Sequence, residues 1–404
     1  MSEAVNIPQL RFSEFSGEWE KNIFKNIVKL QRGSSPRPIV KYVTTSKDGV
    51  NWIKIGDIVS EKNFIDSTKE KITQEGAKKS RKVSVGEIIL SNSMSYGKPI
   101  ILNIDGYIHD GWFVIRGFEN SFDKSYLLQV LGSEWIQKQY KRLAAGGVVN
   151  NISSELVNSV KINLPIKPEQ QKIAAFLSAV DNKIEQLSKK QALLGEYKKG
   201  VMQQIFSQAI RFKADDGGEF PEWEEKKLGK YLTHKSKKNK GAKVDLVLSV
   251  SNKKGFITQD EQFDGYQVAS KDLTNYKIVE KGEYAYNPSR INVGSIARLK
   301  NSAIGIVSPM YVIFKLKSLE PVFFDNLYQT HLFKHLIKVG CSGSVRDSLN
   351  FNDMADFVFN FPSLEEQTKI ANFLSSIDSK IEQVGKQFDE SKQFKKALLQ
   401  QMFV

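Results

Sequence analysis

The chain has 404 residues, of which 40% are hydrophobic and 11% aromatic, so wholesale disorder is excluded and two or three domains are expected. It carries 59 basic and 45 acidic residues, a net charge of +14, which points to a polyanionic partner, most often nucleic acid, or to solubility alone. No secretory signal, no apolar run of about 20 residues and no second cysteine besides Cys341 can be found. We expect a soluble cytoplasmic protein.

Residues 1–150 are predicted to form a first domain. Short β-like runs, such as NWIKIGDIV at 51–59 and GEIILSNS at 86–93, alternate with turn signals. A short helix is expected over 125–141. Because strands and helices do not alternate regularly, the pattern indicates a mixed α/β (α+β) domain without βαβ regularity.

A central helical region follows at 151–208, with one long helix over 168–206. Pro168 suits the first turn of a helix, where its missing N–H is no loss. Apolar residues then recur in steps of three and four, which is the pattern of a coiled-coil seam. The seam residues are Ile173, Leu177, Val180, Ile184, Leu187, Leu194, Val201 and Ile205. Gln191 and Lys198 are polar interruptions that could fix its register.

The second half of the chain repeats the first. Residues 209–350 form a second predicted domain, and 351–404 a second helical region with a helix over 365–403. PIKPEQQKIAAFLSAVDNKIEQ at 165–186 matches PSLEEQTKIANFLSSIDSKIEQ, which starts at Pro362, without a gap. The domains before the two helices differ in almost every surface residue. The helices are therefore expected to share one task and the domains to perform two different ones.

Neither long helix can bury its apolar seam alone. Because a parallel pair would need the chain to run back over the whole helix length, we expect the two helices to pack antiparallel on each other. An intermolecular coiled-coil dimer is the alternative. The expected fold is α/β (α+β), with two domains separated by two long antiparallel coiled-coil helices and an internal pseudo-two-fold repeat.

The loops of both domains are rich in small, polar and basic residues, which can reach phosphates and base edges where glycine lets the backbone approach closely. Ordinary solvent-facing loops have a similar composition. The candidate DNA-binding residues of the first domain are Arg32, Ser34, Ser35, Arg37, Asn92, Ser93, Ser95, Tyr96, Lys98, Asn150 and Asn151. Those of the second domain are Lys235, Lys237, Lys238, Lys240, Asn287, Ser289, Arg290, Asn292, Ser344 and Arg346.

Catalytic motifs are missing from the sequence. It has no GxxxxGK[ST] phosphate loop and no GxGxxG cofactor loop, and NPSR at 287–290 lacks the aromatic residue of an adenine methyltransferase motif. His331 and His335 would share a helix face, but no cluster with metal-ligand spacing surrounds them. We therefore expect no catalytic residue, no metal and no cofactor in this chain, and a recognition role beside catalytic partners.

The doubled motif resembles the conserved regions of type I restriction–modification specificity subunits. In that family a Pro, a Glu-Gln-x-x-Ile and an Asp-x-x-Ile follow each target-recognition domain. They are similar here to Pro165 with EQQKI at 169–173 and DNKI at 181–184, and to Pro362 with EQTKI and DSKI in the second copy. VNWIKIGDI at 50–58 is similar to a strand of the family's first recognition domain. In the second domain DLVLSVSNKKGFI replaces this pattern, which puts its DNA-facing surface in doubt.

The resemblance implies a sequence-specific subunit that reads a bipartite, asymmetric double-stranded DNA target, with a spacer set by the coiled coil. It further implies two methyltransferase subunits and two restriction subunits as partners, which use S-adenosylmethionine, ATP and Mg²⁺. The residues that it assigns to subunit docking and the coiled coil are Glu169, Gln170, Ile173, Phe176, Leu177, Asp181, Ile184, Glu366, Gln367, Ile370, Phe373, Leu374, Asp378 and Ile381. A stand-alone bipartite DNA-binding regulator and a self-contained restriction enzyme are the alternatives.

Overall fold

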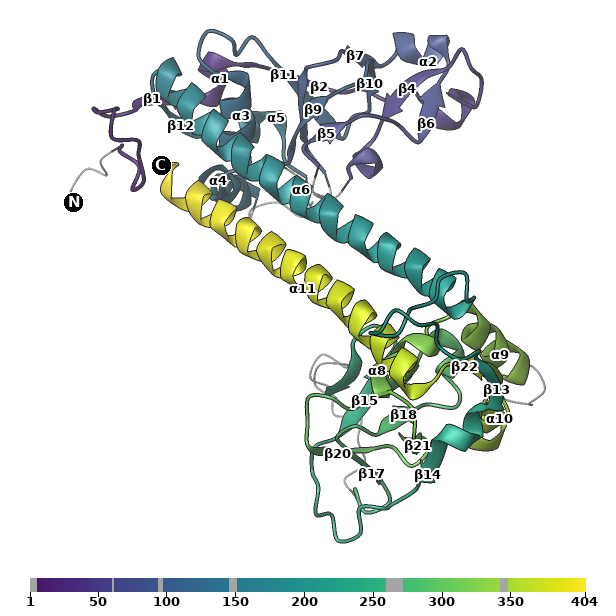
Figure 1. The fold of residues 1–404 in the computed structure, drawn as a ribbon. Helices are drawn as coiled ribbons and strands as arrows, with labels where there is room; N and C mark the ends of the chain where they lie inside the picture. Colours follow the sequence, from purple (N-terminus) through teal and green to yellow (C-terminus); the bar gives the residue numbers. More distant parts are fainter. Residues whose placement is uncertain (1–5, 60–61, 94–96, 145–150, 259–271, 342–347) are drawn as a thin grey trace. The chain divides into compact units, whose positions relative to one another are not determined.

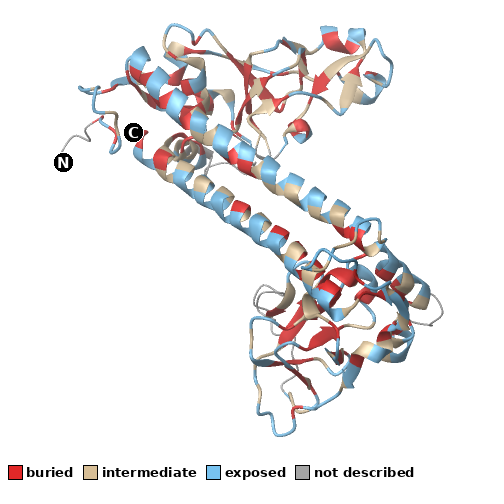
Figure 2. Cartoon of the chain, viewed as in Figure 1, coloured by how far each residue is buried: buried red, intermediate tan, exposed pale blue. Residues whose placement is uncertain are grey.

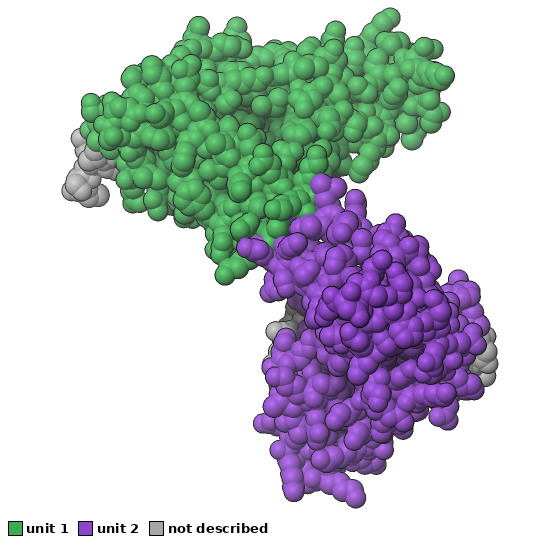
Figure 3. Space-filling model, viewed as in Figure 1, with its two compact units in different colours: residues 1–190, 384–404 green, residues 191–383 purple. Residues whose placement is uncertain are grey.

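The computed structural model describes residues 6–59, 62–93, 97–144, 151–258, 272–341 and 348–404. Its contacts divide the chain into two compact units (Figure 3). Unit 1 consists of residues 1–190 and 384–404, and unit 2 of residues 191–383. Each unit thus combines one domain with a part of both long helices.

Unit 1 contains two five-stranded sheets, a two-stranded sheet and several helices (Figure 1). Its strands are β1 (Glu20–Ile23), β2 (Lys29–Arg32), β3 (Val43–Thr44), β4 (Val50–Ile53), β5 (Phe64–Ile65), β6 (Glu70–Ile72), β7 (Arg81–Val83), β8 (Ile88–Ser91), β9 (Pro99–Leu102), β10 (Gly106–Ile108), β11 (Trp112–Arg116) and β12 (Lys161–Leu164). Its helices are α1 (Phe24–Ile27), α2 (Gln74–Lys78), α3 (Lys124–Leu131), α4 (Glu134–Ala144), α5 (Ser154–Asn158) and the first part of α6 (Lys167–Phe206).

Unit 2 is built around a four-stranded sheet. Its strands are β13 (Glu224–Lys227), β14 (Leu232–Lys235), β15 (Leu248–Ser251), β16 (Gly255–Thr258), β17 (Lys277–Glu280), β18 (Tyr284–Tyr286), β19 (Ile296–Arg298), β20 (Ile304–Val307), β21 (Val312–Leu316) and β22 (Val358–Phe361). Its helices are α8 (Pro321–Leu327), α9 (His331–Cys341), α10 (Phe351–Ala355) and the first part of α11 (Leu364–Gln401).

The two units share one sheet topology. The strand order β2-β11-β8-β9 of unit 1 reappears as β14-β21-β18-β19 in unit 2. The pairs β1–β12 and β13–β22 are both antiparallel and join the start of each domain to the strand before each long helix. The units differ in what is added. Unit 1 has a five-stranded sheet, β3-β6-β4-β10-β7, and β5 at the edge of the shared sheet, whereas unit 2 has the two-stranded pairs β15–β16 and β17–β20. The internal repeat seen in the helices therefore extends through the domains.

The strands of the shared sheet bury both faces because side chains alternate between two clusters (Figure 2). In β8, Ile88 and Leu90 pack in the cluster that also holds α3 and α6, whereas Ile89 packs against the second sheet. In unit 2, Tyr284 and Phe314 pack toward the long helices, while Ile313 faces the hairpin side. This explains the nearly continuous apolar runs of these strands.

Within each unit the long helices are antiparallel. In unit 1, Leu177 near the start of α6 shares a core cluster with Leu398 near the end of α11. In unit 2, Ile205 near the end of α6 shares a cluster with Leu374 near the start of α11. The expected antiparallel pair is confirmed, and α6 and α11 begin one residue earlier than expected, while α11 ends at Gln401.

Equivalent ion pairs connect the two helices in the two units. Lys395 Nζ lies 2.5 Å from Asp181 Oδ1 in unit 1, and Lys198 Nζ lies 2.7 Å from Asp378 Oδ1 in unit 2. Both lysines interrupt the apolar seam, and both aspartates belong to the repeated motif. Because each pair forms in only one helix register, the polar interruptions contribute to the register of the pair.

Two local expectations were wrong. The helix expected over 125–141 is divided into α3 and α4, because the chain turns at Gly132 and the Ser133 hydroxyl accepts the amide of Ile136 at 3.4 Å. The strand expected over 51–59 ends at Ile53. The Asp57 carboxylate accepts the Lys54 amide at 2.8 Å and thereby stabilises a single 3-10 turn.

Candidate nucleic-acid interface

The predicted DNA-binding loops of unit 1 meet at one edge of its shared sheet. Strands β2 and β8 both end at this edge, and β11 begins there after the turn 109–112. The loops that follow β2 and β8 carry most of the predicted residues. We call the loop 33–38, residues 92–93 and 97–98, and this turn the first loop edge. The sheet thus brings the loop 33–38 together with segments that begin at Asn92, 54 residues beyond its last residue.

Four of the predicted residues converge on Asp110, which the sequence analysis had not selected. The Ser35 hydroxyl donates to Asp110 Oδ1 at 2.7 Å, and Arg37 Nη2 lies 3.5 Å from Oδ2. The carbonyl oxygen of Asp110 accepts Arg32 Nε at 3.0 Å and Asn92 Nδ2 at 2.8 Å. Asp110 is therefore the common partner of both loops.

The third predicted loop returns to the same place. Asn151 forms an isolated β-bridge with Ser93, and the Ile152 amide donates to the Asn92 carbonyl at 2.9 Å. Lys98 lies at the start of β9, where its amide donates to the Ser91 hydroxyl at 3.0 Å. Ser34 also faces this edge and donates its hydroxyl to the Lys79 carbonyl at 3.2 Å. The predicted residues Ser95, Tyr96 and Asn150 lie outside the described residues.

Two glycines are required by the close packing of the first loop edge. A Cβ on Gly33 would lie 2.0 Å from the His109 carbonyl oxygen, and one on Gly111 would lie 2.1 Å from the His109 ring. Side chains at either position would displace the backbone that carries Asp110. The glycines therefore fix the shape of this edge.

His109 lies half-buried beneath the first loop edge beside Trp52, with the ring centroids 6.1 Å apart. The amides of Gly111 and Ile55 approach its Nδ1 and Nε2 at 2.8 and 3.2 Å. Burial lowers the pKa of His109, and the adjacent Asp110 carboxylate offsets part of this effect. A neutral ring can accept one of these two N–H groups at its unprotonated nitrogen, whereas a protonated ring can accept neither. His109 Nδ1 also lies 3.5 Å from Asp110 Oδ1.

The loops of unit 2 meet at the equivalent edge. Strands β14 and β18 end there, and β21 begins after the turn 308–311. The same hydrogen bond closes the turn in both units. Tyr311 N donates to the Ser308 carbonyl at 3.0 Å in unit 2, and Trp112 N donates to the His109 carbonyl at 3.2 Å in unit 1. Lys235, the last residue of β14, lies at this second loop edge.

The loop after β18 folds back on itself and contacts the following segment. Asn287 Oδ1 accepts the Ser289 amide at 3.1 Å, and the Asn287 carbonyl accepts the Arg290 amide at 3.0 Å. The Leu349 amide donates to the Pro288 carbonyl at 3.2 Å, so the chain at Leu349 also lies at this edge. Ser289, Arg290 and Asn292 are exposed. Ser344 and Arg346 lie outside the described residues.

The lysine-rich loop reaches the second loop edge through β17. Lys238 forms a bridge with Lys277, whose Nζ donates to the Tyr311 carbonyl at 2.7 Å. Lys237 lies 3.5 Å from the Glu280 carboxylate, and Lys240 is exposed. Burial and the neighbouring Lys238 lower the pKa of Lys277. An anion bound here would relieve this repulsion.

Asp110, His109 and Lys277 were not among the residues predicted from the sequence. None of them lies in a loop with the Gly-, Ser-, Asn- and Lys-rich composition of the predicted loops. Asp110 precedes a glycine at a turn, which is a weak signal, and Lys277 lies inside a strand. Only the pairing of distant strands places them beside the predicted residues.

The repeated Glu-Gln of α6 faces its own domain. The Glu169 carboxylate is 1% exposed and accepts Arg11 Nε and Nη2, each at 2.8 Å, and Trp19 Nε1 at 3.3 Å. The Gln170 side chain accepts the Asp123 amide at 2.8 Å and donates to two carbonyls of the domain. We call this set of contacts the first staple.

Unit 2 contains an equivalent second staple. The Glu366 carboxylate is completely buried and accepts Arg211 Nη2 and Trp223 Nε1, both at 3.0 Å. The Gln367 side chain accepts the Glu320 amide at 2.9 Å and donates to the carbonyl of Pro362, as Gln170 does to Pro165. In each unit the staple fixes the start of the long helix to its domain.

These positions limit which predicted docking residues can meet a partner. The buried residues of that set lie in the interior of each unit and offer no surface to a partner. They are Glu169, Gln170, Ile173, Leu177, Ile184, Glu366, Gln367, Ile370 and Leu374. Asp181 and Asp378 form the ion pairs between the helices, and Ile381 is half-buried. Phe176 and Phe373 are partly exposed and stack edge-on against Phe12 and Phe212.

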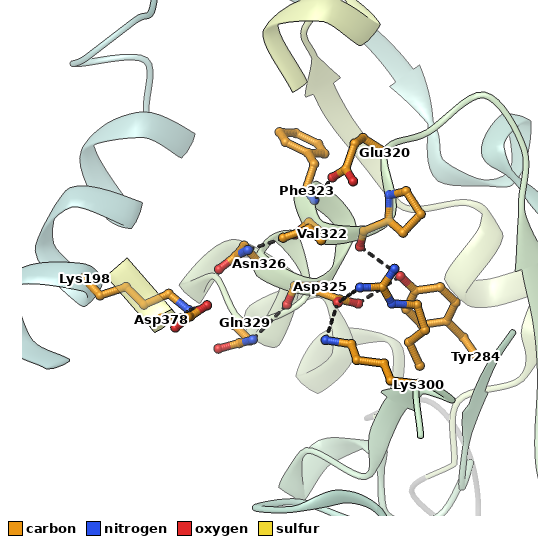
Figure 4. A network of polar contacts seen from close by, with 12 residues as sticks. Lys198, Tyr284, Lys300, Glu320, Val322, Phe323, Asp325, Asn326, Gln329 and Asp378 are labelled. Carbon is orange, nitrogen blue, oxygen red and sulfur yellow. Dashed lines mark hydrogen bonds and ion pairs between the residues drawn. The ribbon is translucent and has the colours of Figure 1, made fainter. Parts of the chain in front are cut away.

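Unit 2 also contains a buried charged network (Figure 4). The Asp325 carboxylate of α8 accepts the Tyr284 hydroxyl at 2.9 Å, Arg298 Nη2 at 2.6 Å and Lys300 Nζ at 2.9 Å. Burial raises the pKa of Tyr284, so its hydroxyl remains a donor. The network fixes α8 to β18 and β19. Among the described residues no His, Cys, Asp and Glu group could hold a metal ion.

Comparison with known proteins identifies the family. The profile described as "Type I restriction modification DNA specificity domain" matches residues 17–194 and again 221–388. The chain belongs to this family. It carries two copies of the family's domain, in agreement with the two repeated units.

Relatives of the family cover the whole chain. The putative type I restriction enzyme MjaX specificity subunit of Methanocaldococcus jannaschii is 26% identical over 98% of this chain and 95% of its own. The MjaVIII specificity subunit of the same organism is 24% identical over 78% of both chains. Specificity subunits are the non-catalytic components of type I restriction–modification enzymes, and this chain shares that class.

Solved structures support the fold. The type I S subunit from M. genitalium has a TM-score of 0.58 at 14% identity and covers 98% of this chain and 99% of its own. A chain from a study of type I R-M complex assembly and conformational transition has a TM-score of 0.53 at 17% identity, with 94% and 96% covered. No helix in the described part of the specificity chain has the length and apolarity needed to cross a membrane.

The staples give a first prediction. Glu169→Ala leaves the Arg11 guanidinium partly buried without its carboxylate, and should lower the free energy of unfolding of unit 1 by about 3–5 kcal/mol. Glu366→Ala should do the same in unit 2. Hydrogen exchange of each unit measures both effects. Glu14→Ala, which removes an exposed pair with Lys172 at 2.9 Å, should leave the stability of unit 1 nearly unchanged because water already screens this pair. Equal losses in all three variants would contradict the role of the staples.

His109 gives a pH-dependent prediction. Since its pKa is lower in the folded protein than its ordinary value of 6.5, the unfolded chain binds the proton more readily. The free energy of unfolding of unit 1 should therefore be highest above pH 6.5 and fall as the pH decreases. Urea unfolding at pH 7.5 and 5.5 should show a smaller decrease for His109→Gln than for wild type. The exposed His331 provides the control variant; the same change there would argue against His109 as the cause.

Proposed function

We propose that this chain is the DNA-specificity subunit of a type I restriction–modification complex, in which each unit reads one half of a bipartite, asymmetric target on double-stranded DNA. The observation that carries this proposal is the equivalence of the two loop edges. The same sheet edge in both units gathers basic and polar loops, while the loop sequences differ. A repeated scaffold with different loops fits two readers of different sequences.

The side chains at the two edges fit two kinds of DNA contact. Lysines around Lys238 and Lys277 provide positive charge for phosphates, which gives affinity without sequence preference. Arginine and asparagine side chains, such as Arg37 and Asn287, can pair with base edges in the major groove. The first edge carries more ordered polar side chains, and the second carries more lysines.

The long helices are proposed to set the distance between the two half-sites and to dock the partner subunits. Two methyltransferase subunits would use S-adenosylmethionine to methylate adenines, and two restriction subunits would use ATP and Mg²⁺. This chain contributes recognition and needs no cofactor for it. Comparing adenine methylation of cellular DNA with and without this chain tests the proposal. Unchanged methylation would favour a stand-alone DNA-binding regulator.

If each unit recognises its half-site independently, the result of a domain exchange can be predicted. Replacing residues 1–145 with the corresponding domain of another specificity subunit should change one half-site of the methylated sequence and leave the other half-site and the spacer unchanged. The physical reason is that each loop edge forms entirely within its own unit. Methylome sequencing measures the outcome. A change in both half-sites would show that the two units do not recognise their half-sites independently.

The helices predict the spacer. Inserting one heptad after Lys190 in α6 and one after Gln387 in α11 keeps the seam in phase and lengthens both helices by about 10.5 Å at 1.5 Å per residue. At about 3.4 Å per base pair, the recognised spacer should grow by about three base pairs. Methylome sequencing should find both half-sites unchanged. A heptad inserted in only one helix misaligns the apolar seam and should abolish methylation. An unchanged spacer in the double insertion would refute the proposal that the helices set the distance between the half-sites.

A further inference from the structure

Asp110 is a carboxylate on an edge proposed to approach DNA. Its side chain is 42% exposed. A negative charge there repels phosphates and lowers the affinity for any DNA sequence. Such a residue needs a compensating role, which its contacts reveal.

Asp110 contacts two arginines, Arg32 at the end of β2 and Arg37 in the loop that follows. Its carboxylate holds Ser35 at 2.7 Å and lies 3.5 Å from Arg37 Nη2, while its carbonyl holds Arg32 Nε at 3.0 Å. The same carbonyl also accepts Asn92 Nδ2 at 2.8 Å. One residue thus orients donors from two loops.

The backbone of Asp110 is itself fixed. The turn closes through Trp112 N and the His109 carbonyl, and Gly33 and Gly111 pack too closely for any side chain. The Asp110 amide also approaches the Ser35 hydroxyl at 3.3 Å. Movements of Asp110 would therefore disturb the whole edge, so it is a rigid anchor.

Arg37 extends from this anchor into solvent. Its side chain is 84% exposed, although one end of its guanidinium lies beside the Asp110 carboxylate. An untethered arginine loses much rotamer entropy when it binds a base. A carboxylate beside one end of the guanidinium would reduce this loss and leave the other N–H groups without a protein partner in this pair. A planar guanidinium held in this way suits the O6 and N7 acceptors of guanine.

We propose that Asp110 is a positioning residue that sets the base preference of unit 1, by holding Arg37 for a guanine in its half-site. This inference rests on the proposed function. The device is specific to unit 1, because the equivalent turn of unit 2 has Pro309 in place of Asp110. Asp110 therefore lowers the affinity for any DNA sequence, and it raises the discrimination of unit 1 between its correct half-site and mismatched half-sites.

The test uses Asp110→Asn in the complex assembled with its methyltransferase subunits. Binding is measured to the cognate site, to sites with one mismatch in either half, and to unrelated DNA. At the guanine of the unit 1 half-site, discrimination should fall about tenfold or more, because a good arginine–guanine pair supplies that much. Affinity for unrelated DNA should stay equal or rise. Discrimination in the other half-site should not change.

Control variants separate positioning from folding. Asp66→Asn removes the same charge from the opposite end of the same sheet, where Asp66 pairs with Lys62 at 3.2 Å, and should leave discrimination unchanged. Arg37→Ala should lose discrimination at the same guanine as Asp110→Asn, but with weaker binding to all DNA. If Asp110→Asn does not fold, Ser35→Ala should show a smaller loss at that guanine.

Three outcomes would overturn the inference. Full discrimination in Asp110→Asn would show that the carboxylate does not position the reader. Loss in both half-sites would indicate a general structural defect. If Asp110→Asn loses discrimination at a different base position from Arg37→Ala, Asp110 does not act through Arg37. If the wild-type complex itself failed to discriminate either half-site, the proposed function would fall, and this inference with it.

Discussion

The buried carboxylate of each staple is the interaction on which the rest of the structure depends. A carboxylate removed from water is stable only when it is paired and hydrogen-bonded. Glu169 therefore requires Arg11 and Trp19, and Glu366 requires Arg211 and Trp223. These partners come from the start of each domain, before its first strand. The staple thus closes each domain between its first strand and its long helix, and leaves the loops at the opposite strand ends free to differ.

The loop edges show how one scaffold can hold different readers. In both units the sheet buries alternate side chains in two clusters, so the strands tolerate little change. The loops at their ends contribute few residues to either cluster, among them Trp112 in unit 1 and Tyr311 in unit 2. Unit 1 uses this freedom for a rigid group around Asp110, and unit 2 for lysines around Lys277. The two units therefore differ most in their loops, where sequence changes disturb the hydrophobic core least.

Much of the architecture could be predicted from the sequence, because the repeat and the heptad seam are local patterns. The helix bounds and the antiparallel pairing follow from them, and the Gly- and Ser-rich loops were found by their turn chemistry. Asp110 and the inward direction of Glu169 could not be predicted, since Arg11 is 158 residues from Glu169. The division at Gly132 was missed because the apolar pattern continues through it. The break is marked only by the turn at Gly132 and by the Ser133 hydroxyl, which accepts the Ile136 amide.

Unit 1 is assembled from two separate stretches of chain, whereas unit 2 is one continuous stretch. Leu398 and Met402 complete the core of unit 1, and the Leu10 amide donates to the Gln401 carbonyl at 3.0 Å. The corresponding contact of unit 2, between Ile210 and Gln204, joins neighbours in sequence. On a ribosome, unit 2 could close as soon as it emerges. The first domain to be translated would be the last to be completed, and would need protection from aggregation until the final turns of α11 arrive.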